Sequence, residues 1–115
     1  INDALKRAIE YSKAGSDLIM IHSKENNPKK IFEFSRKFLK TKYAKPLVAV
    51  PSTYSKTPEK DLIKNGFKIV IYANHLLRSS YFAMYQNAEK ILRSKRSFEA
   101  EKQMTSIKDI ISLIK

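Results

Sequence analysis

Three short apolar runs of this sequence end on residue pairs that include a polar side chain. The three pairs are His22 and Ser23, Pro51 and Ser52, and Asn74 and His75. Open α/β sheets and (β/α)8 barrels place their chemistry on side chains at the carboxyl ends of buried strands. His22 is therefore the first candidate for a functional residue, because its imidazole ends the first of these runs.

The residue types at these positions exclude several kinds of site. None of the three pairs contains a carboxylate, the oxygen ligand that Mg²⁺ prefers, so any metal ligands must lie elsewhere. The chain has two glycines, Gly15 and Gly66, and both stand at expected helix ends, which excludes a glycine-rich nucleotide turn or a Walker loop. It has no cysteine, so disulfides and thiolate metal sites within the chain are excluded as well.

The elements that position these pairs alternate between helix and strand. Strands are predicted over residues 18–21, 46–50 and 67–73, and each is a nearly continuous apolar run. Because such strands are apolar on both sides, we expect both faces of the sheet to be covered and the strands to be parallel.

Helical segments are predicted before, between and after the strands. The expected N-caps are Asp3, Asn27, Thr57, Asn74 and Ser106, with prolines after the second and third, and the first and third helices end near Gly15 and Gly66. Apolar faces are expected on the second helix at Ile31, Phe34 and Phe38, and on the long fourth helix at Leu77, Tyr81, Met84, Ala88 and Ile91. Three strands make an incomplete sheet, so residues 1–115 are interpreted as a single partial domain, the C-terminal part of a larger α/β fold.

Composition indicates a soluble, cytoplasmic protein without a membrane partner. The 115 residues are 43% hydrophobic, and none of the apolar runs approaches the roughly 20 residues that a membrane span requires. The net charge of +12 raises the question of nucleic-acid binding. The basic residues are spread along the polar faces of the helices, however, so we expect a solvated basic surface that favours anionic substrates, and no nucleic acid as a partner.

Several segments resemble, in the same order and at similar spacing, the C-terminal half of the phosphoenolpyruvate mutases of the isocitrate lyase superfamily. The segments are residues 4–7, Ala14 and Gly15, IHSK at 21–24, PLVAVPSTYSKTP at 46–58 and IVIYANHLLRSSYFAM at 69–84. The resemblance implies a TIM-type (β/α)8 barrel in which this chain supplies the sixth, seventh and eighth strands. It also implies a Mg²⁺-dependent enzyme of phosphonate biosynthesis that interconverts phosphoenolpyruvate and phosphonopyruvate by moving a phosphoryl group between oxygen and C3.

The resemblance also assigns roles to individual residues. The substrate-site histidine of the family falls on His22, which would lie beside the transferring phosphoryl group and donate a hydrogen bond to it. Such a donor suits phosphoryl transfer, which depends on positioning and charge stabilisation. Ser23 and Ser52 are predicted to contact the substrate. The magnesium carboxylates, the phosphate-binding arginine and the gating loop of the family match no position here, so the Mg²⁺ ligands are expected in the N-terminal half of the barrel.

Each candidate also has a purely structural interpretation. His22 can be a polar residue bonded to neighbouring backbone, and Ser23 can satisfy local backbone groups. Ser52 can be a turn residue, Asn74 a helix cap and His75 a packing residue.

The sequence leaves three functions open. The first is a phosphoenolpyruvate mutase, of which this part would be inactive alone and which would form homo-oligomers through its C-terminal helices. The second is a phosphonopyruvate hydrolase or a carbon–carbon lyase of the same superfamily. The third is a non-catalytic basic interaction module with an exposed helical seam.

Overall fold

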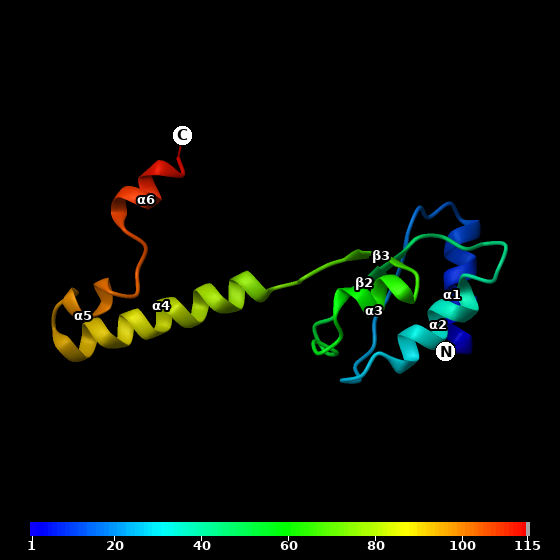
Figure 1. Ribbon diagram of the computed structural model, residues 1–115, viewed down its shortest axis with the longest axis horizontal. Coiled ribbons are helices and arrows are strands. Elements are labelled where there is room, and N and C mark those ends of the chain that lie inside the picture. The colour runs from blue at the N-terminus through cyan, green and yellow to red at the C-terminus, as the bar shows by residue number, and fades with distance from the viewer. Residues whose placement is uncertain (115) are drawn as a thin grey trace. The chain divides into compact units, whose positions relative to one another are not determined.

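The computed structural model describes residues 1–114, which fall into two compact units, Ile1–Ala73 and a second that begins at Asn74. The first unit alternates helix and strand along the chain (Figure 1). Its elements are α1 (Asn2–Lys13), β1 (Ile19–Ile21), α2 (Lys29–Phe38), β2 (Leu47–Ala49), α3 (Glu59–Lys64) and β3 (Phe67–Val70). The predicted order of helices and strands is therefore confirmed, although all three strands are shorter than expected.

The three strands form one parallel sheet in the order β1-β2-β3, which confirms the predicted parallel pairing. Ile19 lies opposite Leu47, and Leu47 lies opposite Phe67. An irregularity between Leu47 and Val48 shifts the register of β3, so that Val48 faces Ile69 rather than Lys68. Since all three strands run in the same direction, their carboxyl ends share one edge of the sheet.

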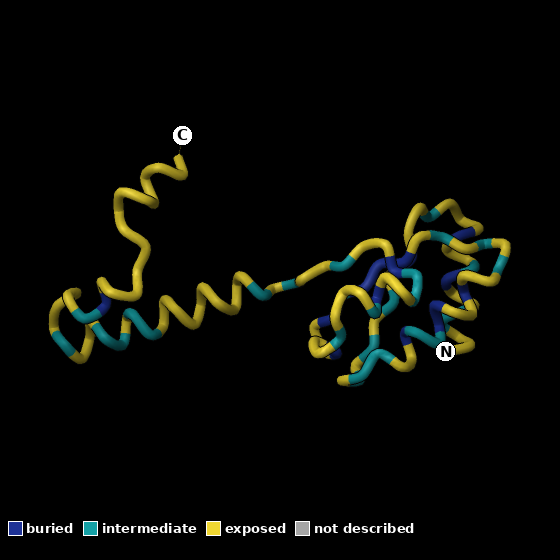
Figure 2. Tube along the Cα trace, viewed as in Figure 1, coloured by how far each residue is buried: buried dark blue, intermediate teal, exposed yellow. Residues whose placement is uncertain are grey.

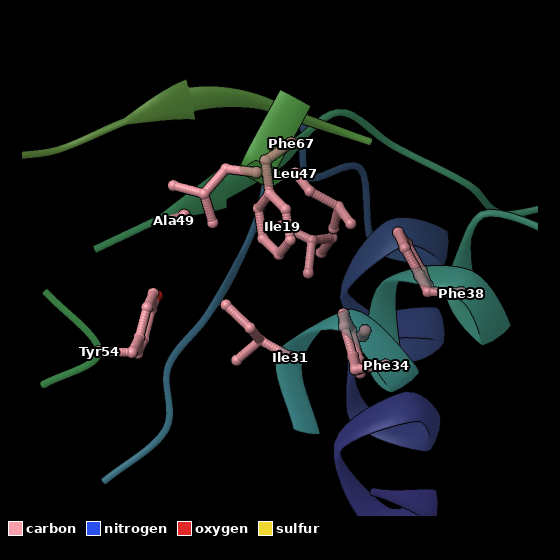
Figure 3. Close-up of a cluster of buried hydrophobic side chains, with 10 residues drawn as sticks. Ile19, Ile31, Phe34, Phe38, Leu47, Ala49, Tyr54 and Phe67 are labelled. Atoms are coloured by element: carbon pink, nitrogen blue, oxygen red, sulfur yellow. The ribbon is translucent and has the colours of Figure 1, made fainter. Parts of the chain in front are cut away.

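A buried apolar cluster joins the sheet to α2, as the dark segments of Figure 2 and the close-up in Figure 3 show. Ile31, Phe34 and Phe38 are buried along one face of α2, as their spacing predicts. The rings of Phe34 and Phe38 stack with centroids 5.6 Å apart. This cluster fixes the strands against the helices, and thereby fixes the edge of the sheet that carries His22.

The opposite face of the sheet is open at its two outer strands. Met20, Val48 and Ile69 are register partners across the three strands and alternate with the core residues. Met20 is 61% exposed and Ile69 40%, whereas Val48 on the central strand is buried. The expectation that both faces are covered is therefore wrong at the two outer strands of the part of the chain described here. In a closed barrel this inner face is filled by side chains from the other strands, which explains why the strands are apolar on both sides.

Helix starts differ from the prediction in detail. Asp3 lies within the first turn of α1 and pairs with Arg7 instead of capping the helix. Pro28 and Pro58 take the N-cap positions of α2 and α3, although Asn27 still accepts a hydrogen bond from the Lys29 amide at 3.2 Å. Both prolines therefore lie one residue earlier in their helices than the sequence suggests.

The second unit consists of helices α4 (His75–Ser94), α5 (Phe98–Glu101) and α6 (Ile107–Ser112). Asn74 is at the N-cap position of α4 but has a left-handed backbone (φ 54°) and no side-chain cap bond. The predicted cap of α6 is confirmed, because the Ser106 hydroxyl accepts a hydrogen bond from the Asp109 amide at 3.1 Å. Nothing in the sequence predicted α5. Within residues 1–114, no helix is long and apolar enough to cross a membrane.

The apolar seam of α4 is exposed rather than packed. None of the residues of this helix is buried (Figure 2). Its predicted seam residue Leu77 is 70% exposed. Tyr81, Met84 and Ile91 are exposed as well. The α6 residues Ile107, Ile110 and Ile111 are also exposed. These side chains give both helices exposed apolar surface in the described chain.

Replacement of Gly66 by alanine is expected to lower the free energy of unfolding by about 1–3 kcal/mol, measured by urea denaturation. Gly66 has φ +86°, and an added Cβ would collide with Cδ1 of Leu39, whose side chain must then rotate. Gly15→Ala is the matched control, because Gly15 also has a positive φ (+101°) but nothing within 4 Å of an added Cβ. Gly15→Ala is expected to lower the free energy of unfolding by less than Gly66→Ala does. Equal losses would show that crowding against Leu39 has no effect.

Candidate functional site

The carboxyl edge of the sheet brings the first two predicted pairs together. Ile21 and Ala49 are register partners at the ends of β1 and β2, so His22 and Val50 follow at the same level. The amide of Ile71, just beyond β3, donates to the Ala49 carbonyl at 2.8 Å and extends the sheet at this edge. His22 directly follows the end of β1, as the sequence predicted, and it is exposed.

His22 stands beside a small pocket of about 130 Å³ in the first unit. The lining includes His22, Ser23 and Lys30 together with apolar side chains of α1, β1 and α2. Lys30 forms an ion pair with Glu25 at 2.5 Å, and this hydrogen bond raises the pKa of the lysine. The Glu25 carboxylate balances the charge of this ammonium group, so the pair adds little net charge beside the imidazole.

Ser23 accepts hydrogen bonds through both its side-chain hydroxyl and its backbone carbonyl. Its hydroxyl oxygen accepts a hydrogen bond from the Glu25 amide at 3.2 Å, which is the local structural role that the sequence left open. Its carbonyl oxygen accepts a second hydrogen bond, at 2.6 Å, from the hydroxyl of Thr53. The Ser23 hydroxyl keeps its own proton and can still donate to a bound molecule.

Ser52 lies in the loop that follows β2. Its amide donates to the Val50 carbonyl at 2.9 Å, a tight turn at the end of the strand, and its side chain is exposed. The turn-forming role therefore describes its backbone. Ser23 and Ser52 thus both stand on loops at the edge that carries His22.

Tyr54 is part of this site although sequence reasoning did not single it out. Its ring is fully buried below the strand ends, near Ile31 and Ala49 (Figure 3), and its centroid lies 6.5 Å from that of the His22 ring at an interplanar angle of 42°. Burial raises the pKa of the Tyr54 hydroxyl, and the backbone of Val50 offsets part of this rise. Within residues 1–114 the hydroxyl has no hydrogen bond of normal geometry. The sequence signal that could have identified Tyr54 was an aromatic residue inside an otherwise polar loop.

The third predicted pair belongs to the second unit. The Asn74 carbonyl accepts a hydrogen bond from the Arg78 amide at 2.9 Å, so this residue opens α4 through its backbone. His75 is the first residue of the helix. The site described here is built from the first unit alone, and this pair lies outside it.

The site offers hydrogen-bond donors and positive charge rather than metal ligands. In the described part of the chain, no three His, Asp or Glu side chains gather closely enough to hold a metal ion. An imidazole and two hydroxyl groups are available at the edge instead, on a chain with a net charge of +12. This arrangement can bind and orient an anionic group, but it cannot by itself supply the coordination sphere of Mg²⁺.

Comparison with known proteins gives a consistent result. The family profile described as phosphoenolpyruvate phosphomutase matches residues 1–92. The phosphoenolpyruvate phosphomutase of Tetrahymena pyriformis is 32% identical over 98% of this chain and 37% of its own length. The phosphonopyruvate hydrolase of Variovorax sp. strain Pal2 is 33% identical over 96% of this chain and 38% of its own length.

Solved structures show the same likeness. A phosphoenolpyruvate phosphomutase from Streptomyces platensis subsp. rosaceus has a TM-score of 0.90 and 32% identity, over 97% of this chain and 38% of that one. A phosphonopyruvate hydrolase in complex with oxalate and Mg²⁺ has a TM-score of 0.87 and 33% identity, over 97% and 39%. The chain thus spans little more than a third of these relatives. The likeness confirms the predicted fold, part of an α/β barrel.

Proposed function

Because the chain belongs to the phosphoenolpyruvate phosphomutase family, we propose that the full-length protein interconverts phosphoenolpyruvate and phosphonopyruvate and acts in phosphonate biosynthesis. The observation that carries the proposal is the family match over residues 1–92, together with the likeness to a solved phosphomutase at a TM-score of 0.90. In the proposed reaction a phosphoryl group moves between oxygen and C3 of the pyruvyl unit, and the residues of this chain form one part of the barrel mouth.

In this proposal His22 donates a hydrogen bond to the transferring phosphoryl group. Its support is the exposed position of the imidazole just after β1, beside a pocket that Ser23 also lines. Ser23 and Ser52 contact the substrate through hydroxyl groups on the neighbouring loops. Phosphoryl transfer needs positioning and stabilisation of charge on the phosphoryl oxygens, and hydrogen-bond donors fixed by a rigid sheet can supply both.

Magnesium is the proposed cofactor, by likeness to the hydrolase solved with oxalate and Mg²⁺. Residues 1–114 offer no cluster of ligands for it, so we place its ligands outside this part of the chain. No step is assigned to the residues of this chain through the metal. Their contribution is to bind and orient the phosphoryl end of the substrate.

A phosphonopyruvate hydrolase is the second candidate. A hydrolase matches the chain with 33% identity and a TM-score of 0.87, values close to those of the phosphomutases. Both activities use phosphonopyruvate, and they differ in whether the phosphoryl group returns to the pyruvyl oxygen or passes to water. The residues described here bind the phosphoryl end in both cases, so they do not discriminate between the two.

We further propose that the full-length protein is a homo-oligomer held together by its C-terminal helices. The support is the apolar surface of α4 and α6, whose largest side chains are exposed in this chain. Leu76 and Leu77 at the start of α4 and Ile107 and Ile114 near the C-terminus are 70% exposed or more. A second copy with the same apolar surface can cover them by a self-complementary contact.

Phosphorus NMR of the full-length protein with phosphonopyruvate and Mg²⁺ tests the proposed reaction. We expect the phosphonate signal to be replaced by that of phosphoenolpyruvate, and chelation of the metal with EDTA to stop the conversion until Mg²⁺ is added back. Inorganic phosphate and pyruvate as products would instead assign the hydrolase. Absence of any turnover would contradict both and favour a non-catalytic module.

A further inference from the structure

We infer that Thr53 is a positioning residue, which holds His22 and Ser23 in place from the neighbouring loop. The inference rests on the proposed function, because the residues that Thr53 positions are those proposed to bind the phosphoryl group. Neither Thr53 nor Tyr54, the residue that follows it, was a candidate from the sequence. Both stand in the loop after β2, and both contact the end of β1.

The hydrogen bond of Thr53 is the direct link between the two loops. Its hydroxyl donates to the Ser23 carbonyl at 2.6 Å, across 30 residues of sequence. Ser23 lies only two residues beyond the end of β1, in a segment that continues without helix or strand until Lys29. A bond to this carbonyl therefore restrains the peptide that follows Ser23, one residue beyond His22, at a point where the strand itself no longer does so.

The buried side chain of Tyr54 anchors the loop that carries Thr53. The Tyr54 side chain is fully buried under the strand ends, near Ile31 and Ala49 (Figure 3), so the loop cannot move without extracting an aromatic ring from the core. The same ring lies 6.5 Å from the His22 ring and limits the space into which the imidazole can turn. One loop therefore restrains both the backbone and the ring of the first candidate residue.

This restraint is expected to affect reactivity more than folding. The Thr53–Ser23 hydrogen bond lies at the surface, where water can replace it, so its loss changes global stability little. Catalytic positioning is more sensitive, because a misplacement of about 1 Å can lower a rate by on the order of 100-fold. A hydrogen bond with little effect on stability can therefore have a large effect on kcat.

The test compares Thr53→Val, which keeps the shape of the side chain and removes the donor, with Thr53→Ser, which restores the donor. In the full-length protein we expect Thr53→Val to lower kcat about tenfold with KM little changed, and Thr53→Ser to restore most of the rate. Ser55→Ala is the control, because Ser55 is exposed in the same loop, and it should leave kcat unchanged. Equal rates in Thr53→Val and the wild type would overturn the inference.

A second measurement separates this inference from the proposed function. Proton NMR of the His22 imidazole, assigned as the signal that His22→Gln removes, reports the environment of the ring without any turnover. We expect Thr53→Val to shift or broaden this signal and Thr53→Ser to leave it as in the wild type. If the wild type turns over neither substrate, the proposed function fails, yet the signal still tests the contact. An unchanged His22 signal in Thr53→Val overturns the positioning role in either case.

Discussion

Replacement of His22 by alanine is expected to lower kcat of the full-length protein by about 100-fold, the usual cost of removing one hydrogen-bond donor from a developing negative charge. The folded state should remain intact, because the imidazole is exposed at the end of β1 and contributes little to the core. Steady-state kinetics measure the first effect, and thermal unfolding followed by circular dichroism measures the second.

A more conservative variant sharpens this test. His22→Gln keeps an amide donor of similar reach, and we expect it to retain more activity than His22→Ala. Both variants should leave the melting temperature within a few degrees of the wild type. Unchanged turnover in His22→Ala would remove His22 from the site, and a large loss of stability would assign it the structural role that the sequence left open.

Replacement of Phe38 by alanine is expected to lower the free energy of unfolding by about 3–5 kcal/mol, as for other large-to-small changes of buried aromatic residues. Phe38 is fully buried at the last turn of α2 and stacks on Phe34 at an interplanar angle of 12°. Because typical domains are stable by only about 5–15 kcal/mol, this single change removes a large part of the total. Urea denaturation measures this loss in the free energy of unfolding.

Tyr11→Ala is the matched control for this change. It also removes an aromatic side chain from a helix of the first unit, but Tyr11 is 56% exposed on α1. We expect its effect on the free energy of unfolding to stay near 1 kcal/mol or below. A loss as large for Tyr11 as for Phe38 would contradict the assignment of the core to the inner face of α2.

The sequence predicted those parts of the fold that depend on local patterns. The apolar spacing of Ile31, Phe34 and Phe38 gave the buried face of α2, and the positions of Gly15 and Gly66 gave two helix ends with positive φ. The apolar runs gave three parallel strands, because a strand without polar alternation is buried on both sides in its complete fold. The placement of His22 at a strand end followed from these patterns.

Other features depend on tertiary contacts, and the sequence could not supply them. The bond between Thr53 and Ser23 joins two loops whose approach is set by the pairing of β1 with β2. The caps of α2 and α3 were misplaced by one residue, because a polar residue followed by proline fits either of two adjacent positions. The exposed seam of α4 has the pattern of a packed helix, and spacing alone does not reveal which partner packs against it.

The order of the sheet has a consequence for handling this polypeptide. In the described chain β2 is paired on both sides, whereas β1 and β3 each present one row of unpaired amide and carbonyl groups. Next to these rows lie exposed apolar side chains such as Met20 and Ile69. Open strand edges beside such side chains template aggregation, so residues 1–115 produced alone are expected to enter inclusion bodies unless chaperones or a complementary polypeptide protect both edges.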